Sequence, residues 1–287
     1  MGRTALNRGH AVGRVCYPTY GWRIANPPYI WEHNDYSIDV LGATTVNCGA
    51  TATCDSPENS AFREDIRRWA EVSDRLWVWD YVACFTNYLL PFPNLRVLGE
   101  NIRFFIRHGV TGIFEEGNYQ SPHGEFSSLR GYVLAKLLWG PDHDLDQAVG
   151  EFLEGVFGAA AGPIRRYIDL LHDKVERENI HLHISEQPDA PYLTDEILAV
   201  SEKLWDEAEA AVAGQAEILE QVRIARLSLD WIVLERSKEH SPVFRQRAER
   251  FFARAEATGV MMISEWRDES LADYKERITR PLAKVRQ

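Results

Sequence analysis

Two short apolar runs on either side of an amphipathic segment constrain the fold of this chain most. The runs are "LWVWDY" (76–81) and "VTGIF" (110–114), and strands buried on both faces are apolar along their whole length in this way. Residues 94–109 lie between them, with a helical stripe of apolar side chains that ends at a glycine. A strand, a helix and a second strand with short links predict a parallel sheet.

Helical patterns continue on both sides of this unit. Residues 56–73 begin with Ser-Pro-Glu and place Phe62, Ile66 and Trp69 on one face, and residues 125–140 are again amphipathic. The alternation predicts an α/β fold. Parallel sheets place their working residues at the carboxyl ends of the strands. Asp80 and the pair Glu115 and Glu116 occupy those ends.

The chain changes character near residue 143. Residues 1–142 are expected to form a partial (β/α) barrel, although 1–54 lack a sustained period beyond strand-like stretches at 14–20 and 35–46. Residues 143–287 are expected to form an α-helical domain without strands. Within it, residues 215–240 are predicted to be one long helix.

Composition and motifs exclude several classes of function. The net charge of -11 argues against nucleic acid and anionic membranes as partners. We find no signal peptide and no membrane-spanning stretch, so a cytoplasmic location is expected. No nucleotide-binding glycine motif occurs, so we expect no cofactor. The four cysteines are expected to be thiols, and His181 and His183 lack a third metal ligand, so no metal is expected.

The orientation of the first strand decides the role of Asp80. Side chains alternate along a strand, so Trp77 and Trp79 share one face while Val78 and Asp80 share the other. We expect the tryptophans to pack against helices and Asp80 to point inward at the mouth of the sheet. The alternative is an aspartate that merely ends the strand as a cap or in an ion pair.

Glu115 and Glu116 are the second acidic candidate. Only one of two adjacent residues can face the mouth of the sheet. A pair of carboxylates on neighbouring strands is what glycoside hydrolysis needs, because one protonates the leaving oxygen while the other acts as nucleophile, as base or on a substrate acetamide. The alternative is that one glutamate forms an ion pair with an arginine of the preceding helix, such as Arg107.

Aromatic and amide side chains follow both strands. Loops after barrel strands carry binding residues, and tyrosine, asparagine and tryptophan suit sugars. The expected substrate-binding residues are Trp79, Tyr81, Asn87, Tyr88, Asn118 and Tyr119.

Three stretches resemble a known bacterial family. They are W-D-Y (79–81) with N-Y-L-L-P-F-P-N (87–94), F-E-E-G-N-Y-Q-S (114–121) and L-R-x-Y-x-L-A-K-L-L-W-x-P-D (129–142). With these motifs the chain resembles a domain family first catalogued as of unknown function and later tied to glycoside hydrolase family 163. The resemblance covers about residues 55–180.

The resemblance implies the C-terminal half of a TIM-like (β/α)8 barrel followed by helices. It also implies endo-β-N-acetylglucosaminidase activity on glycans, by acid-assisted hydrolysis with or without assistance from the substrate acetamide. Asp80, Glu115 and Glu116 match motif positions and are the implied catalytic residues. Where the family has an apolar strand ending in Ile-Glu-Cys-Cys, residues 35–54 read "DYSIDVLGATTVNCGATATC", so one candidate carboxylate is missing.

Other hypotheses follow from the same features. A half-barrel exposes two sheet edges, so we expect a truncated, weakly active enzyme that associates with another copy through those edges. A non-catalytic carbohydrate-binding or scaffold protein would use the same pocket without turnover. A third hypothesis is a helical interaction module in which residues 194–287 bind a partner.

Overall fold

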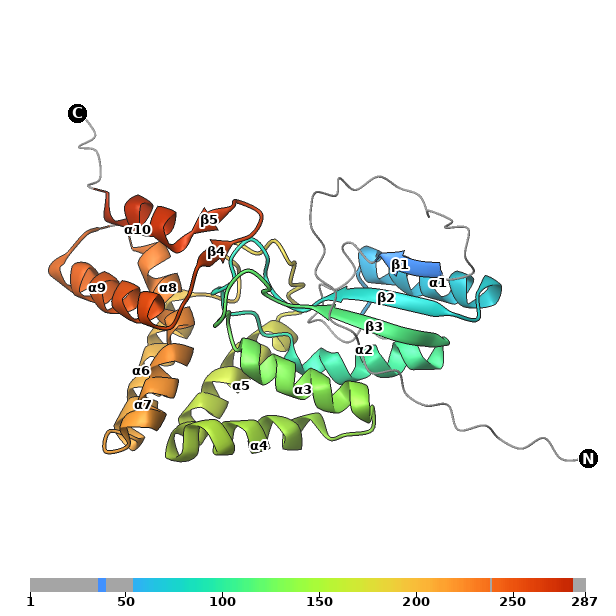
Figure 1. The fold of residues 1–287 in the computed structure, drawn as a ribbon, viewed down its shortest axis with the longest axis horizontal. Helices are drawn as coiled ribbons and strands as arrows, with labels where there is room; N and C mark the ends of the chain where they lie inside the picture. Colours follow the sequence, from blue (N-terminus) through green and yellow to red (C-terminus); the bar gives the residue numbers. More distant parts are fainter. Residues whose placement is uncertain (1–35, 40–53, 238, 281–287) are drawn as a thin grey trace, which may run out of the picture.

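A computed structural model describes residues 36–39, 54–237 and 239–280 (Figure 1). The fold is mixed α/β and mostly helical, and the described strands do not close into a barrel. Three parallel strands form one sheet in the order β1-β2-β3, with Asp80 directly opposite Glu115. The strands are β1 (Tyr36–Asp39), β2 (Leu76–Tyr81) and β3 (Val110–Glu116).

The helices follow the predicted alternation and then continue to the C-terminus. Helix α1 begins at Pro57, and the Ser56 side chain caps it by accepting from the Asn59 N–H at 3.1 Å. The helices are α1 (Pro57–Val72), α2 (Leu95–Arg107), α3 (Ser127–Trp139), α4 (Leu145–Phe157), α5 (Ala161–Arg177), α6 (Asp195–Ala211), α7 (Ala216–Ala225), α8 (Leu227–Arg236), α9 (Pro242–Ala257) and α10 (Leu271–Thr279).

Helices α1 and α2 cover the same face of the sheet. Leu76 and Val78 of β2 are buried there in one cluster with Phe62 and Ile66 of α1 and with Phe105 of α2. Among the described residues, strands in consecutive order are thus combined with two helices on one face of the sheet.

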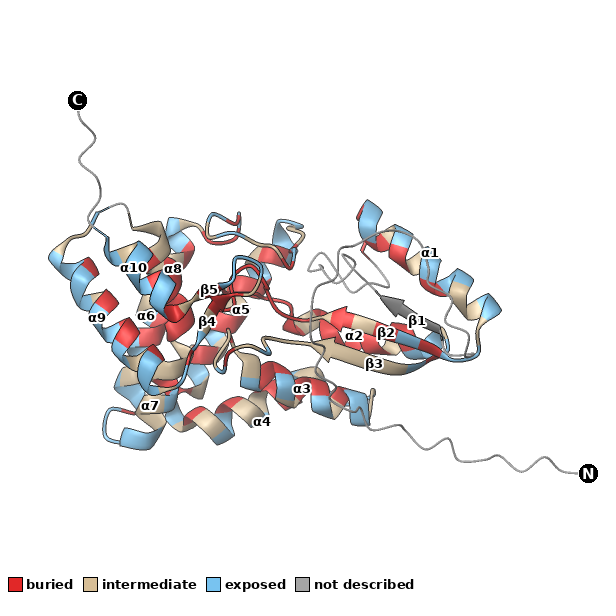
Figure 2. Cartoon of the chain, turned by 45° about the horizontal axis from the view of Figure 1, so that its top comes forward, coloured by how far each residue is buried: buried red, intermediate tan, exposed pale blue. Residues whose placement is uncertain are grey.

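The predicted orientation of β2 is therefore wrong. Leu76, Val78 and Asp80 form the buried, helix-covered side, whereas Trp77 remains 47% exposed on the opposite face. Figure 2 shows buried and less buried residues alternating along β2. The aliphatic side chains fit between the helices, and the Trp77 ring instead lies over Gly112 of β3, where a Cβ would come within 2.5 Å of it. The tryptophans thus face away from α1 and α2.

A second and larger core joins the loop after β2 to the helical region. It runs from Leu89 and Leu98 through Leu153 and Trp205 to Tyr274. The long helix expected at 215–240 is divided into α7 and α8 at Arg226, whose side chain pairs with Asp206 and Glu209 of α6. None of the described helices is long and apolar enough to cross a membrane.

The helical region also contains two strands, which corrects the expectation that it has none. β4 (Met262–Ser264) and β5 (Glu269–Ser270) form an antiparallel hairpin between α9 and α10. Both strands are too short to show a periodic pattern in the sequence. In Figure 1 the hairpin lies over the loops that follow β2 and β3.

Some sequence predictions concern residues outside the described ranges. The strand expected at 14–20, Cys48 and most of 35–46 lie there, while β1 falls inside the last of these stretches. The expectation that every cysteine is a thiol is wrong at Cys54, which is disulfide-bonded, whereas Cys84 is a buried thiol.

A buried arginine holds the loop after β2 in place. Arg130 of α3 donates to the Phe92 carbonyl, to Asn94 Oδ1 and to the Glu125 carboxylate, the last at 2.7 Å. Asn94 in turn donates to the Val82 carbonyl at 3.1 Å. Arg130 thus binds the C-terminal end of the loop directly and its N-terminal end through Asn94. These hydrogen bonds hold residues 82–94 in place beside the strand ends.

Candidate functional site

The face of the sheet away from α1 and α2 carries a row of aromatic rings that ends in a carboxylate. Trp79 lies edge-on to Phe114 of the neighbouring strand, with ring centroids 4.7 Å apart. Tyr81 follows on the same face and is the register partner of Glu116. This face thus brings a half-buried acid to the carboxyl ends of β2 and β3, next to three rings.

A hydrogen bond orients that acid. The indole Nε1 of Trp79 donates to Glu116 Oε2 at 2.6 Å. An indole N–H can only donate, so it fixes Glu116 as an acceptor. Arg107, the alternative ion-pair partner considered from the sequence, instead pairs with Glu100 at 2.7 Å.

Asp80 and Glu115 form a separate acidic pair on the helix-covered side. They are direct partners across β2 and β3, and Asp80 is 3% exposed. Asp80 Oδ1 accepts from the Tyr81 backbone N–H at 2.9 Å, and Glu115 Oε2 is buried without a hydrogen-bond partner among the described residues. The sheet therefore separates the three predicted catalytic acids into a buried pair and Glu116.

The buried pair retains a proton near neutral pH. Burial raises the pKa of Asp80 to about 7, and the Tyr81 N–H opposes this shift. Burial also raises the pKa of Glu115 well above its ordinary value, and the Asp80 charge adds to the shift. No cation of the described residues pairs with either carboxyl, and two adjacent carboxyls cannot both ionise cheaply, so we expect the pair to share one proton.

A second carboxylate approaches the open face from the C-terminal hairpin. The Tyr88 hydroxyl donates to Glu265 Oε2 at 2.9 Å and lies 3.3 Å from Gln120 Oε1. Burial and then the Glu265 charge raise the pKa of Tyr88, and Glu116 contributes too. Burial, Glu265 and Glu116 likewise raise the pKa of Tyr119. Two carboxylates and two phenols thus border the same space.

Backbone hydrogen bonds fasten the hairpin to both strand-end loops. The Glu265 N–H donates to the Phe85 carbonyl at 3.0 Å, and the Tyr88 N–H donates to the Ile263 carbonyl at 2.8 Å. The Met261 N–H donates to Ser121 Oγ at 3.1 Å. The hairpin therefore forms part of the wall of the site.

Asn87 belongs to this attachment and not to the open face. It is buried, and its amide donates to the Glu186 carbonyl while its Oδ1 accepts from Arg267, both at 2.8 Å. Both polar atoms of its side chain form hydrogen bonds with other residues of the protein. We therefore reassign Asn87 from substrate binding to anchoring the hairpin.

Replacing Asn87 with alanine is expected to destabilise the fold by about 2 kcal/mol, because buried polar partners lose their hydrogen bonds. The hairpin should loosen too, so limited proteolysis should cut near 262–270 faster than in the unmodified chain. Chemical denaturation and mass mapping of the fragments test this. Reduced glycan binding at unchanged stability would contradict the anchoring role.

The two predicted binding residues after β3 differ in their roles. Asn118 donates to the Ser121 carbonyl at 2.5 Å and lies against Gly124, so it shapes the loop. Tyr119 is 52% exposed and remains available to a ligand.

Sequence reasoning missed Glu265 and Arg267. The usable signal was local: Gly259 ends α9 with φ +79°, and the apolar residues 260–263 that follow break the helical period. That pattern could predict a strand. It could not predict the contact with Tyr88, because 177 residues separate the partners.

Two other features of the described residues do not form a site. Cys54, Asp55 and His181 bring potential ligand atoms within 4.8 Å of one another, but the Cys54 sulfur is in a disulfide and cannot be a thiolate ligand. A pocket of about 700 Å³ also lies between α9, β5 and α10.

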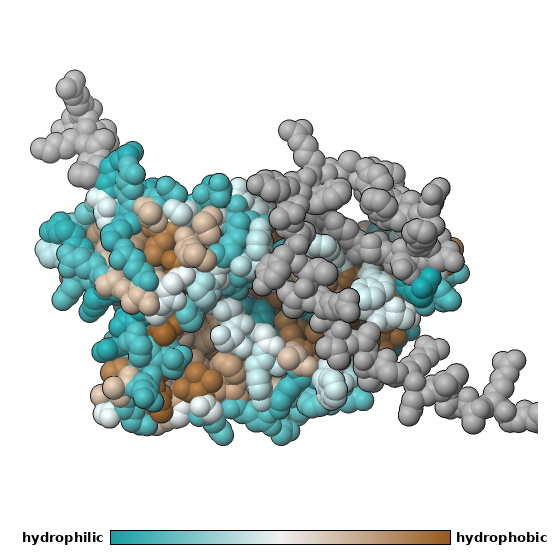
Figure 3. All heavy atoms as spheres, in the orientation of Figure 1, coloured by the Kyte–Doolittle hydropathy of each residue, from teal (hydrophilic) through white to brown (hydrophobic). Residues whose placement is uncertain are grey.

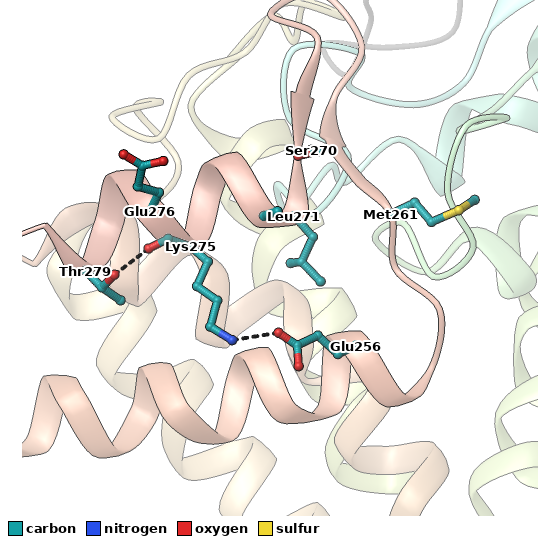
Figure 4. A pocket seen from close by; sticks show the side chains of 8 residues that line it. Glu256, Met261, Ser270, Leu271, Lys275, Glu276 and Thr279 are labelled. Carbon is teal, nitrogen blue, oxygen red and sulfur yellow. Dashed lines mark hydrogen bonds and ion pairs between the residues drawn. The ribbon is translucent and has the colours of Figure 1, made fainter.

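This pocket shows as a small apolar spot among hydrophilic residues (Figure 3), and its charged groups are already paired. Lys275 contacts Glu256 at 2.7 Å (Figure 4), and Glu276 contacts Arg280 at 2.7 Å.

Comparison with known proteins places the chain in a family. A family model described as "Domain of unknown function (DUF4838)" matches residues 15–169, more than half of the chain. The chain belongs to this family. No curated protein and no solved structure matches it. The DUF4838 match includes β1, β2 and β3 with both strand-end loops, whereas the hairpin that carries Glu265 follows it.

Proposed function

We propose that this DUF4838 protein is carbohydrate-active and of the glycoside hydrolase type. It would cleave β-N-acetylglucosaminides of glycans by acid-assisted hydrolysis, with the substrate acetamide assisting. The observation that supports this most is the row of rings of Trp79, Phe114 and Tyr81 that leads to the Glu116 carboxylate. Aromatic faces stack on the apolar faces of sugars, and a carboxylate beside them suits glycosidic chemistry.

Under this proposal Glu116 is the acid nearest the sugar. Asp80 and Glu115 support the strand ends from the opposite side, because they alternate with Trp79, Tyr81 and Glu116 along β2 and β3 and have buried carboxyl oxygens. Tyr81 and Tyr119 would bind sugar hydroxyl or acetamide groups, whereas Tyr88, which is 3% exposed and donates to Glu265, would position that carboxylate. We further propose that β1–β3 belong to the C-terminal half of a TIM-like (β/α)8 barrel, which the consecutive strand order and the one-sided helices support.

A direct test uses two substrates with the same sugar: triacetylchitotriose and the p-nitrophenyl glycoside of diacetylchitobiose. We expect calorimetric binding of the trisaccharide and slow hydrolysis of both. High-mannose N-glycans should be cleaved between their two core N-acetylglucosamines. A protein that neither binds nor cleaves any of these contradicts the proposed function.

A second candidate is a carbohydrate-binding protein without turnover. The position of Asp80 and Glu115 favours it, since two of the three predicted catalytic acids lie on the other face of the sheet from the aromatic row. Binding without hydrolysis, at equal affinity in Glu116→Gln, would support this candidate over the enzyme. Association through the edges of the sheet stays a prediction, which sedimentation tests.

A further inference from the structure

We propose that Glu265 is the proton-donating carboxylate of this site, opposite Glu116. The inference rests on the proposed function and deepens it. Glycoside hydrolysis needs two carboxyl groups that both reach the sugar, whereas Asp80, which is buried, and Glu115, which is half-buried with its Oε2 inaccessible, lie on the other face of the sheet. Glu265 is half-buried and accepts a hydrogen bond from Tyr88 of the loop that follows β2.

The surroundings of Glu265 place it at the site. Its carboxylate accepts from Tyr88, which follows β2. Its charge acts on Tyr119, which follows β3, and the charge of Glu116 acts on the same two phenols. Both carboxylates are therefore neighbours of one pair of rings.

Glu265 is also held in position by its own hairpin. Its backbone N–H donates a hydrogen bond to the Phe85 carbonyl. Arg267, two residues later, donates to Asn87 and Glu269 instead of pairing with Glu265. The nearest arginine of the hairpin is thus engaged elsewhere. Burial raises the pKa of Glu265, while the Tyr88 hydrogen bond opposes the shift. Such an environment favours an acid that is still protonated near the working pH.

Glu265 and Glu116 together can carry out hydrolysis of a glycosidic bond. Glu265 gives its proton to the glycosidic oxygen as the bond from C1 to that oxygen breaks. Glu116, held by Trp79, stabilises the positive charge that develops at C1 or orients the acetamide that attacks it. A water then adds to C1, breaks the bond from C1 to the acetamide oxygen where that bond has formed, and returns a proton to Glu265, so the enzyme ends in its starting state.

The test compares leaving groups in Glu265→Gln. Hydrolysis of triacetylchitotriose expels a sugar alcohol, a poor leaving group that needs a proton, so its kcat/KM should fall by roughly 10²–10⁴. The p-nitrophenyl glycoside has a good leaving group and should lose far less. The decline of activity at high pH, which reports the deprotonation of the acid, should disappear in this variant.

Two further variants make the result decisive. Asp268→Asn lies in the same hairpin at φ +50°, which asparagine tolerates, and should behave like the unmodified chain. Tyr88→Phe keeps the ring but removes the hydrogen bond that opposes the raised pKa of Glu265, so the high-pH decline should move to higher pH. Thermal unfolding checks that each variant folds.

The outcomes separate the two proposals. If the unmodified chain neither binds nor cleaves these sugars, the proposed function and the role of Glu265 both fail. If it cleaves them and Glu265→Gln matches Asp268→Asn on both substrates, only the role of Glu265 is overturned. An equal loss on both substrates would also overturn proton donation. If Glu265→Gln does not fold, an unmoved pH profile in Tyr88→Phe overturns it.

Discussion

Replacing Glu116 with glutamine is expected to lower kcat/KM for chitotriose by roughly 10²–10⁴, the usual range for loss of an acid or base group. The substitution preserves shape but removes the charge that Trp79 holds beside the aromatic row. Because Glu116 would act at C1 and not on the leaving group, activity on the p-nitrophenyl glycoside should fall equally. Steady-state kinetics on both substrates measure this.

The neighbouring residue supplies the matched control. Glu115→Gln makes the same chemical change one position earlier, on the buried side of β3. We expect its kcat/KM to stay within about tenfold of the unmodified chain, because proton transfer requires hydrogen-bond reach of the substrate. If Glu115→Gln abolishes activity and Glu116→Gln does not, the assignment of faces is wrong.

Replacing Asp80 with asparagine is expected to stabilise the fold at pH 8 by roughly 2–4 kcal/mol. Burial raises the pKa of Asp80 from 3.8 to about 7, so the folded state binds more protons than the unfolded state between these values. The free energy of unfolding therefore falls as pH rises from about 4 through about 7. Asparagine cannot ionise, and its oxygen can still accept from the Tyr81 N–H.

Urea denaturation at pH 4 and pH 8 measures this effect. The two proteins should differ little in stability at pH 4, close to the ordinary pKa of 3.8, where the protonation of Asp80 has only begun to differ between the folded and unfolded states, and they should diverge by pH 8. Asp74→Asn, at an exposed position just before β2, is the control and should show no comparable divergence. A difference between Asp80→Asn and the unmodified chain that does not change with pH would contradict the buried, proton-sharing pair.

The sequence predicted the order of β2, α2 and β3 because each element had a strong local pattern. It did not predict which side of β2 faces the helices. Trp77 and Val78 are both apolar, so alternation marks two faces without saying which is covered. Packing decides, since Leu76 and Val78 fit against Phe105 whereas the Trp77 ring lies across Gly112.

Part of the candidate site could also be predicted from local sequence patterns. Glu116, Tyr81, Tyr88 and Tyr119 could be placed at strand ends from local patterns alone, and the structure brings them to one side. Asn87 has the chemistry of a sugar ligand, but its amide is used by Glu186 and Arg267. Such contacts between distant segments depend on tertiary packing, which no periodicity encodes.

The central claim is that the aromatic row ending at Glu116 is the glycan site. A crystal structure of the Glu116→Gln protein soaked with triacetylchitotriose tests it most directly. We predict a sugar ring stacked on the Trp79 and Tyr81 side of the sheet, with its glycosidic oxygen within hydrogen-bond distance of Glu265. A sugar bound elsewhere, or none at a concentration that saturates binding in solution, would contradict the claim.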